Sequence, residues 1–191
     1  MSQLEIWGFI TGAVSVWLAV KENVWNWPAA FANALVFFAL FYHARLYADM
    51  GLQVIFGGIA VLGWYRWLYG GVGHTELPIS HVDRRSVVVL SIITVVSTIA
   101  LALYLQRICD AAPFPDALTT VLSLVGQYLL TKKVIENWSV WIAADVLYIF
   151  MYIRRELFLT SVLYVIFLLM CIAGLVEWRR TLRKSGAVLN S

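Results

Sequence analysis

An apolar stretch at residues 133–155, KVIENWSVWIAADVLYIFMYIRR, carries a carboxylate near its middle, Asp145. Helical residues three or four positions apart share a face, and one face of this stretch alternates polar and aromatic residues: Asn137, Trp141, Asp145 and Tyr148. An aromatic face attracts a cation by roughly 0.5–2 kcal/mol, and an amide can bind a sugar hydroxyl or a carboxamide. This stripe therefore predicts a site for a flat, partly polar solute, including a cationic one.

A carboxylate inside a membrane costs a few kcal/mol, so it should face a bundle interior or a wet cavity. Asp145 is therefore a candidate substrate-binding residue. The alternative is a structural one, in which Asp145 makes a hydrogen bond between helices or packs as a protonated carboxyl. The Asp145→Asn change separates the two, because only a binding role predicts weaker binding with an intact fold.

Further polar residues fall in other apolar runs and extend the predicted site. A second stripe at helical spacing contains Thr120, Ser123, Gln127 and Thr131. An earlier run offers Asn26 and Asn33, and Trp138 begins the run that contains Asp145. Ser123, Gln127, Asn33 and Trp138 are counted as candidate substrate-binding residues. Two structural readings stay open, because amides often join membrane helices and Trp138 sits where interfacial tryptophans gather.

The composition is that of a membrane protein. Of 191 residues, 62% are hydrophobic and only 13% are charged, far from the balance of a soluble domain. No catalytic motif of the common hydrolases, metalloproteases or phosphate-binding loops occurs, and no histidines show metal-ligand spacing. We expect neither an enzyme nor a metal or cofactor, and the charge of +3 gives no reason to expect nucleic acid. Cys109 and Cys171 are expected to be free thiols.

Seven apolar runs are long enough to span a bilayer, which needs about 20 helical residues. They lie near 4–20, 28–43, 51–69, 87–106, 117–132, 138–153 and 158–177. The first run lacks a basic start, so we expect a membrane helix there rather than a cleaved signal peptide. The predicted fold class is an all-α membrane protein with seven transmembrane helices.

Positive charges are distributed unequally between the two faces that these spans define. The face shared with the C-terminus holds ten, Lys21, Arg66, Arg84, Arg85, Lys132, Lys133, Arg179, Arg180, Arg183 and Lys184, against four on the other, Arg45, Arg107, Arg154 and Arg155. Cytoplasmic loops carry an excess of Lys and Arg. We therefore expect a cytoplasmic C-terminus and an N-terminus on the outer side.

The chain is divided by the linker GGVGHTELPISHVDRRS, and its two parts resemble each other. Allowing one or two gaps, Gly12 pairs with Gly126 and Glu22 with Glu136, which brings Asn33 close to the position of Asp145. The predicted arrangement is 3+1+3: a three-helix repeat at 1–70, a loop and linking helix at 71–107, and a second repeat with a tail at 108–191. One linking helix makes the repeats parallel, and transporters built so bind their substrate where the repeats meet.

The remaining tryptophans stand at the ends of the expected spans. Tryptophan gathers at both membrane–water interfaces. We therefore predict an interfacial belt formed by Trp7, Trp25, Trp64, Trp67 and Trp178.

Four short motifs carry a family resemblance: WNWP, LYADMGLQ, GWYRW and ENWSVW. Together they resemble the signature regions of the PnuC family of bacterial vitamin transporters, over nearly the whole chain. The resemblance implies seven spans in a 3+1+3 arrangement similar to that of SWEET sugar transporters. It also implies uptake of nicotinamide riboside by facilitated diffusion across the inner membrane, trapping by cytoplasmic phosphorylation, and a homotrimer. The Asn-x-x-x-Trp motif of the family resembles Asn137 and Trp141, with the amide binding the ribose or carboxamide and the indole stacking on the ring.

Three alternatives remain. Relatives of similar sequence carry thiamine or riboflavin, and thiamine is also a flat aromatic cation, although Thr120, Ser123, Gln127 and Asn137 favour a ribose. A membrane scaffold or sensor would fill the repeat interface with side chains. A membrane enzyme would turn over its bound solute in a reaction that depends on Asp145.

Overall fold

The computed structural model describes residues 3–45, 47–108 and 112–188, and the predicted free thiol of Cys109 lies outside them. The described residues form seven helices: α1 (Gln3–Val20), α2 (Asn26–His43), α3 (Tyr47–Tyr69), α4 (Arg84–Arg107), α5 (Pro113–Thr131), α6 (Glu136–Arg154) and α7 (Phe158–Val188). The prediction of an all-helical chain with seven helices is confirmed.

The helices coincide with the seven apolar runs, apart from their ends. α7 departs most, because it continues past the apolar run at 158–177 through a basic segment to Val188. Within the part of the chain that the structure describes, three helices have the length and composition that crossing a membrane requires: α1, α4 and α7 up to Lys184. α6 instead carries two buried polar side chains, Asn137 and Asp145.

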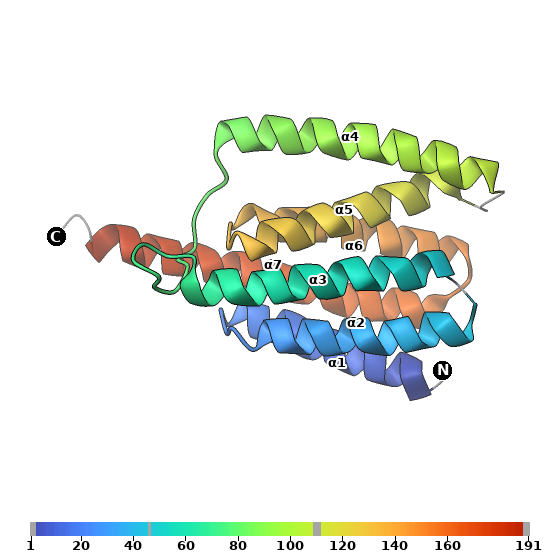
Figure 1. Ribbon diagram of the computed structural model, residues 1–191, viewed down its shortest axis with the longest axis horizontal. Helices are drawn as coiled ribbons and strands as arrows, with labels where there is room; N and C mark the ends of the chain where they lie inside the picture. Colours follow the sequence, from blue (N-terminus) through green and yellow to red (C-terminus); the bar gives the residue numbers. More distant parts are fainter. Residues whose placement is uncertain (1–2, 46, 109–111, 189–191) are drawn as a thin grey trace.

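Six of the helices form a closed ring. Each contacts the next in the order α1, α2, α3, α5, α6, α7, and α7 returns to α1. α4 stands outside this ring and packs along α5 (Figure 1). It carries the chain back along the bundle, so that α5 starts from the same end as α1. α1–α3 and α5–α7 therefore form two three-helix units that meet at two seams, α1 against α7 and α3 against α5.

Four tryptophans fill the core at one end of the ring, which we call the tryptophan end. It is the end where α1, α3 and α5 finish and where α2, α4 and α6 begin. Trp27 packs edge-on against Trp67, Trp67 contacts Trp178, and Trp178 packs edge-on against Trp138. None is more than 3% exposed. The indoles thus join α2, α3, α7 and α6 into one cluster.

The interfacial belt predicted for five tryptophans is wrong for two of them, Trp67 and Trp178. Both are core residues, and each indole N–H donates across a seam: Trp67 Nε1 to the carbonyl of Leu130 (2.9 Å), and Trp178 Nε1 to that of Ala19 (3.1 Å). Each carbonyl also accepts a backbone N–H of the following turn, Leu130 from Lys133 (2.9 Å) and Ala19 from Glu22 (3.0 Å), and the indole N–H takes the second lone pair of the oxygen. The other three, Trp7, Trp25 and Trp64, are 58%, 64% and 41% exposed.

Equivalent features of the two units are related by one constant offset of 111 residues (178 minus 67). It relates the donors Trp67 and Trp178 and also their acceptors, Ala19 and Leu130. It relates the left-handed residues Glu22 and Lys133 (φ 56° and 51°), and likewise Arg45 and Glu156 (φ 59° and 58°). The two units therefore match without a gap from the end of α1 to the end of α3.

This offset corrects the predicted alignment of the two parts. Glu22 corresponds to Lys133 rather than to Glu136, and Gly12 corresponds to Ser123 rather than to Gly126. No gap is needed, because the constant offset aligns the left-handed turns and also identical residues, such as Trp27 with Trp138 and Gly63 with Gly174. Asn33 now matches Ala144. The counterpart of Asp145 is the residue that follows Asn33 in the chain, and consecutive residues lie on different faces of a helix.

The linker between the units is anchored on the second one. Ser80 pairs with the turn between α5 and α6, donating to the Lys133 carbonyl and accepting from Ile135 N–H. The Glu136 carboxylate meets His81 Nδ1 at 2.8 Å and accepts from Val82 N–H at 3.0 Å. These contacts hold the linker at the tryptophan end.

Candidate functional site

The polar and aromatic stripe on α6 faces the inside of the ring. Asn137 is fully buried and Asp145 is only 4% exposed, while Trp141 and Tyr148 are half-buried. The stripe points toward α5 and α7, the two neighbours of α6 in the ring. The structure therefore brings Asn137, Trp141, Asp145 and Tyr148 to one inner face.

Trp141 lies on Gly126 of α5. A Cβ added to Gly126 would stand 3.0 Å from the indole atoms Cε2 and Nε1 of Trp141. That is tighter than ordinary van der Waals contact, so the missing side chain lets the indole lie directly on the α5 backbone. Trp141 also packs against the core cluster around the four tryptophans. These contacts fix the position of the half-buried indole, and a fixed aromatic ring favours stacking on an aromatic solute.

Two acceptor atoms of the stripe are buried without a hydrogen-bond partner among the described residues, Asn137 Oδ1 and Asp145 Oδ2. The Asn137 amide is oriented by its other end, because Nδ2 donates to the Val134 carbonyl at 2.6 Å. Asp145 has the thiol of Cys171, on α7, as a hydrogen-bonding neighbour. Asn26 Oδ1, at the equivalent position of the first unit, and Trp138 Nε1 are likewise unpaired among the described residues. Most buried polar atoms in proteins are hydrogen-bonded, so the acceptors of Asn137 and Asp145, eight residues or about two helical turns apart, are free to accept from the donors of a ligand.

Tyr148 ends the stripe in an aromatic cluster. Its hydroxyl is 3.4 Å from Ser123 Oγ on α5, and its ring lies 4.6 Å from that of Tyr164 on α7. Tyr164 contacts Phe167, which meets Phe9 of α1 at 5.7 Å. These ring contacts extend from α6 through α7 to α1, so the aromatic cluster spans the α1–α7 seam.

The other candidate residues have different surroundings. Asn33 donates through Nδ2 to the Gly8 carbonyl (2.6 Å) and to Thr11 Oγ1 (3.0 Å), which joins α2 to α1. Trp138 packs in the tryptophan cluster and against Gly174 of α7. Gln127 is half-buried on α5, next to Gly126. Asn33 and Trp138 thus have structural contacts, and a role in binding stays a prediction for both.

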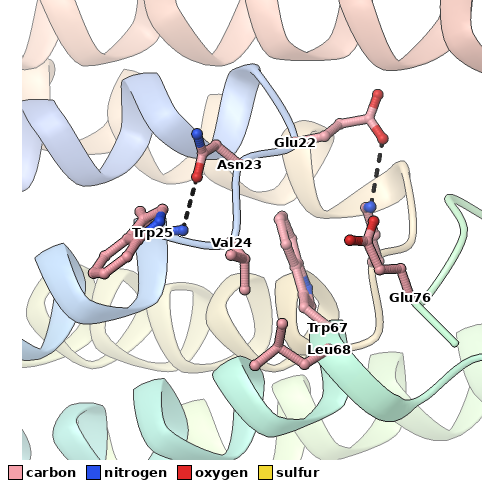
Figure 2. A pocket seen from close by; sticks show the side chains of 8 residues that line it. Glu22, Asn23, Val24, Trp25, Trp67, Leu68 and Glu76 are labelled. Atoms are coloured by element: carbon pink, nitrogen blue, oxygen red, sulfur yellow. Dashed lines mark hydrogen bonds and ion pairs between the residues drawn. The ribbon is translucent and has the colours of Figure 1, made fainter. Parts of the chain in front are cut away.

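Two pockets lie away from the stripe. The larger, of about 350 Å³, opens at the tryptophan end, and its lining includes Glu22, Glu76, Lys133, Trp25 and Trp67 (Figure 2). The smaller, of about 190 Å³, lies between α2 and α3 and is lined by apolar residues such as Phe31, Val61 and Trp64. Neither is lined by a predicted site residue, because the stripe packs against its neighbours inside the ring.

Sequence reasoning missed several residues that the structure places beside the stripe. Cys171 was expected to be a free thiol without a role, and it is free and buried against Asp145. Tyr164 stacks on Tyr148, and Gly126 supports Trp141. All three come from α5 and α7, and the spacing within one helix carries no signal about residues on its neighbours.

Comparisons with known proteins agree with this architecture. The profile of the family described as "Nicotinamide mononucleotide transporter" matches residues 2–180. The nicotinamide riboside transporter PnuC of Escherichia coli is 25% identical, over 98% of this chain and 89% of its own length. The riboflavin/roseoflavin transporter RibM of Streptomyces davaonensis is 26% identical, over 95% of this chain and 87% of its own length.

The fold is also that of a solved transporter. The crystal structure of the vitamin B3 transporter PnuC superposes with a TM-score of 0.73 at 22% identity, over 96% of this chain and 83% of the solved one. Transporters of this kind, with helices as apolar as these, are integral membrane proteins. By the extent of the family match, the chain belongs to the PnuC family of vitamin transporters, described as nicotinamide mononucleotide transporters.

Proposed function

We propose that this protein carries nicotinamide riboside across the bacterial inner membrane by facilitated diffusion, with cytoplasmic phosphorylation trapping the product. The observation that carries the proposal is the inner stripe of α6, with an oriented indole and two unpaired buried acceptors, Asn137 Oδ1 and Asp145 Oδ2. A pyridinium ring is a flat cation that stacks on an indole, and ribose hydroxyls and a carboxamide are donors for the two acceptors. Gln127, Ser123 and Tyr148 complete the proposed site.

The proposed architecture is a parallel 3+1+3 repeat, SWEET-like, with units at 1–70 and 108–191 joined by 71–107. It is supported by the constant offset between equivalent contacts and by the exchange symmetry of the two seams, α1–α7 and α3–α5. Transport then proceeds by rocking one unit against the other around the central site.

The proposed orientation places the tryptophan end in the cytoplasm. That end holds the ten basic residues of the more positive face, and cytoplasmic loops carry such an excess. The N-terminus is then periplasmic and the C-terminus cytoplasmic. The proposal also includes a homotrimer in the bilayer, which only the family resemblance implies.

A binding titration tests substrate and site together. Detergent-purified protein is titrated with nicotinamide riboside, thiamine and riboflavin, with calorimetry as the measure of affinity and tryptophan fluorescence as the measure of stacking. We expect saturable binding and quenching by nicotinamide riboside, and loss of the quenching in Trp141→Phe. Trp7→Phe, which removes an exposed indole, is the matched control. Binding of none of the three vitamins would favour the scaffold or sensor instead.

Asp145→Asn is expected to weaken binding of nicotinamide riboside roughly tenfold, or about 1.4 kcal/mol, because the change removes a negative charge but keeps the size of the side chain. Riboflavin, whose ring system is neutral, should lose no affinity by this route. Calorimetry on folded protein measures both. Unchanged affinity for nicotinamide riboside would reduce Asp145 to a packing role.

Riboflavin is the second candidate substrate, because RibM is about as similar to this chain as the Escherichia coli PnuC is. The isoalloxazine ring can also stack on Trp141, and its ribityl hydroxyls can donate to Asn137. Thiamine, a flat cation, is the third. The titration above ranks the three directly.

A further inference from the structure

We infer that Glu22 and Lys133 form a latch that closes the tryptophan end of the ring, so that these two residues gate release of the solute there. The inference deepens the proposed function and rests on it. Glu22 Oε2 and Lys133 Nζ are 3.4 Å apart. Glu22 belongs to the first three-helix unit and Lys133 to the second, so the ion pair spans the junction between the bodies that must move apart.

The two residues hold the same position in their units. Each occupies the turn after the first helix of its unit, and each has a left-handed backbone (φ 56° and 51°). A left-handed turn is uncommon for residues other than glycine, and here it presents the two side chains to each other across the ring. The same turn thus carries a negative charge in one unit and a positive charge in the other.

Both charges also hold the opposite unit through a second contact. Lys133 Nζ lies 4.8 Å from the centre of the Trp67 ring on α3, and Glu22 Oε1 accepts from the Thr181 hydroxyl on α7 at 2.9 Å. Arg66 on α3 donates to Thr131 Oγ1 on α5 at 3.1 Å nearby. These three polar contacts between the units all lie at the tryptophan end, whereas Phe9 and Phe167 meet through their rings farther along the α1–α7 seam.

An ion pair at this place suits a reversible closure. The Lys133 side chain is 8% exposed and the Glu22 side chain 25%, and the cost of desolvating such charges offsets much of their attraction. The pocket at this end is lined by both residues, so it brings solvent up to the pair (Figure 2, dashed line from Glu22). When the units separate, both charges regain water, and the net cost of opening stays small.

The native thiol of Cys171 reports whether the latch is closed. Cys171 is 4% exposed, packs in the same cluster as Trp67 and Trp178, and precedes Trp178 by two helical turns on α7. In a Cys109→Ser background it is the one remaining cysteine of the sequence. Its labelling rate by a membrane-impermeant methanethiosulfonate is measured in vesicles of each orientation.

We expect Glu22→Lys to raise the labelling rate roughly tenfold from the face that carries the tryptophan end, because two ammonium groups repel each other across the junction. Lys133→Glu should do the same. The double variant Glu22→Lys/Lys133→Glu restores an attractive pair and should label within about twofold of the parent. Glu76→Lys is the matched control, since it makes the same charge change in the lining of the same pocket and should leave the rate unchanged.

Three results would each overturn the latch. Glu22→Lys could label at the rate of the parent or at the rate of Glu76→Lys, or the double variant could be as reactive as the single ones. If a reversal variant does not fold, Glu22→Gln and Lys133→Gln replace it, with a rise of roughly threefold expected because attraction is lost without repulsion. Labelling needs no substrate. A failed latch is therefore distinguishable from a failed transport proposal, which the binding titration tests separately.

Discussion

Replacing Trp141 by alanine is expected to weaken nicotinamide riboside binding by roughly 10–100-fold, or about 1.4–2.8 kcal/mol. Contacts with Gly126 and with the core cluster fix the position of the indole, so its loss removes a preformed stacking surface. A desolvated contact between a cation and an aromatic face contributes about 2 kcal/mol. Calorimetry on the purified variant gives the affinity directly.

Two control variants make this result specific. Trp141→Phe keeps an aromatic face and should lose less affinity than Trp141→Ala. Trp7→Ala removes an exposed indole of α1 and should bind like the parent. Parent affinity in Trp141→Ala would show that the stripe on α6 is not where the pyridinium stacks, and it would leave the family assignment intact.

Gly174→Ala is expected to destabilise the protein by about 1–3 kcal/mol, the usual cost of overpacking a core. A Cβ at Gly174 would stand 2.6 Å from the Trp138 indole, and Trp138 is 2% exposed and held against Trp178. Gly63→Ala should behave alike, because its Cβ would meet the ring of its equivalent partner, Trp27, even more closely. The apparent melting temperature in detergent should fall by roughly 3–10 °C in each.

Gly58→Ala is the matched control for these two variants. It makes the same substitution within α3, and an added Cβ there would meet nothing within 4 Å. Because alanine favours a helix over glycine by up to about 1 kcal/mol, this variant should melt at or slightly above the parent temperature. A similar loss in all three variants would mean that the tryptophan cluster does not depend on the two glycines.

The residues of the candidate site that lie on a single helix were predictable from the sequence. Asn137, Trp141, Asp145 and Tyr148 share a face because of the helical period alone, and the structure turns that face inward. Their supports on other helices were not predictable in the same way. Gly126, Cys171 and Tyr164 reach the stripe only because α5 and α7 flank α6.

By itself the sequence determined the class of protein, the number of helices and, within about four residues, their ends, apart from the end of α7, which lies eleven residues beyond the predicted run. The physical reason is that a bilayer imposes one length and one hydropathy on each span, so each helix is readable from its own residues. The motifs around Asn137 and Trp141 also sufficed to indicate the family, which the comparisons then showed.

Only the tertiary structure decided the closed order of the ring, the register of the two units and the burial of Trp67 and Trp178. A tryptophan at the end of a span satisfies its N–H equally well at a lipid headgroup or on a helix-end carbonyl, so hydropathy cannot separate an interfacial indole from a core one. The register depended on turns, where Glu22 and Lys133 share a backbone conformation but no chemical similarity. Such equivalence shows in three dimensions, because the two units share the geometry of their turns and contacts throughout but identical residues at only some positions, such as Trp67 and Trp178.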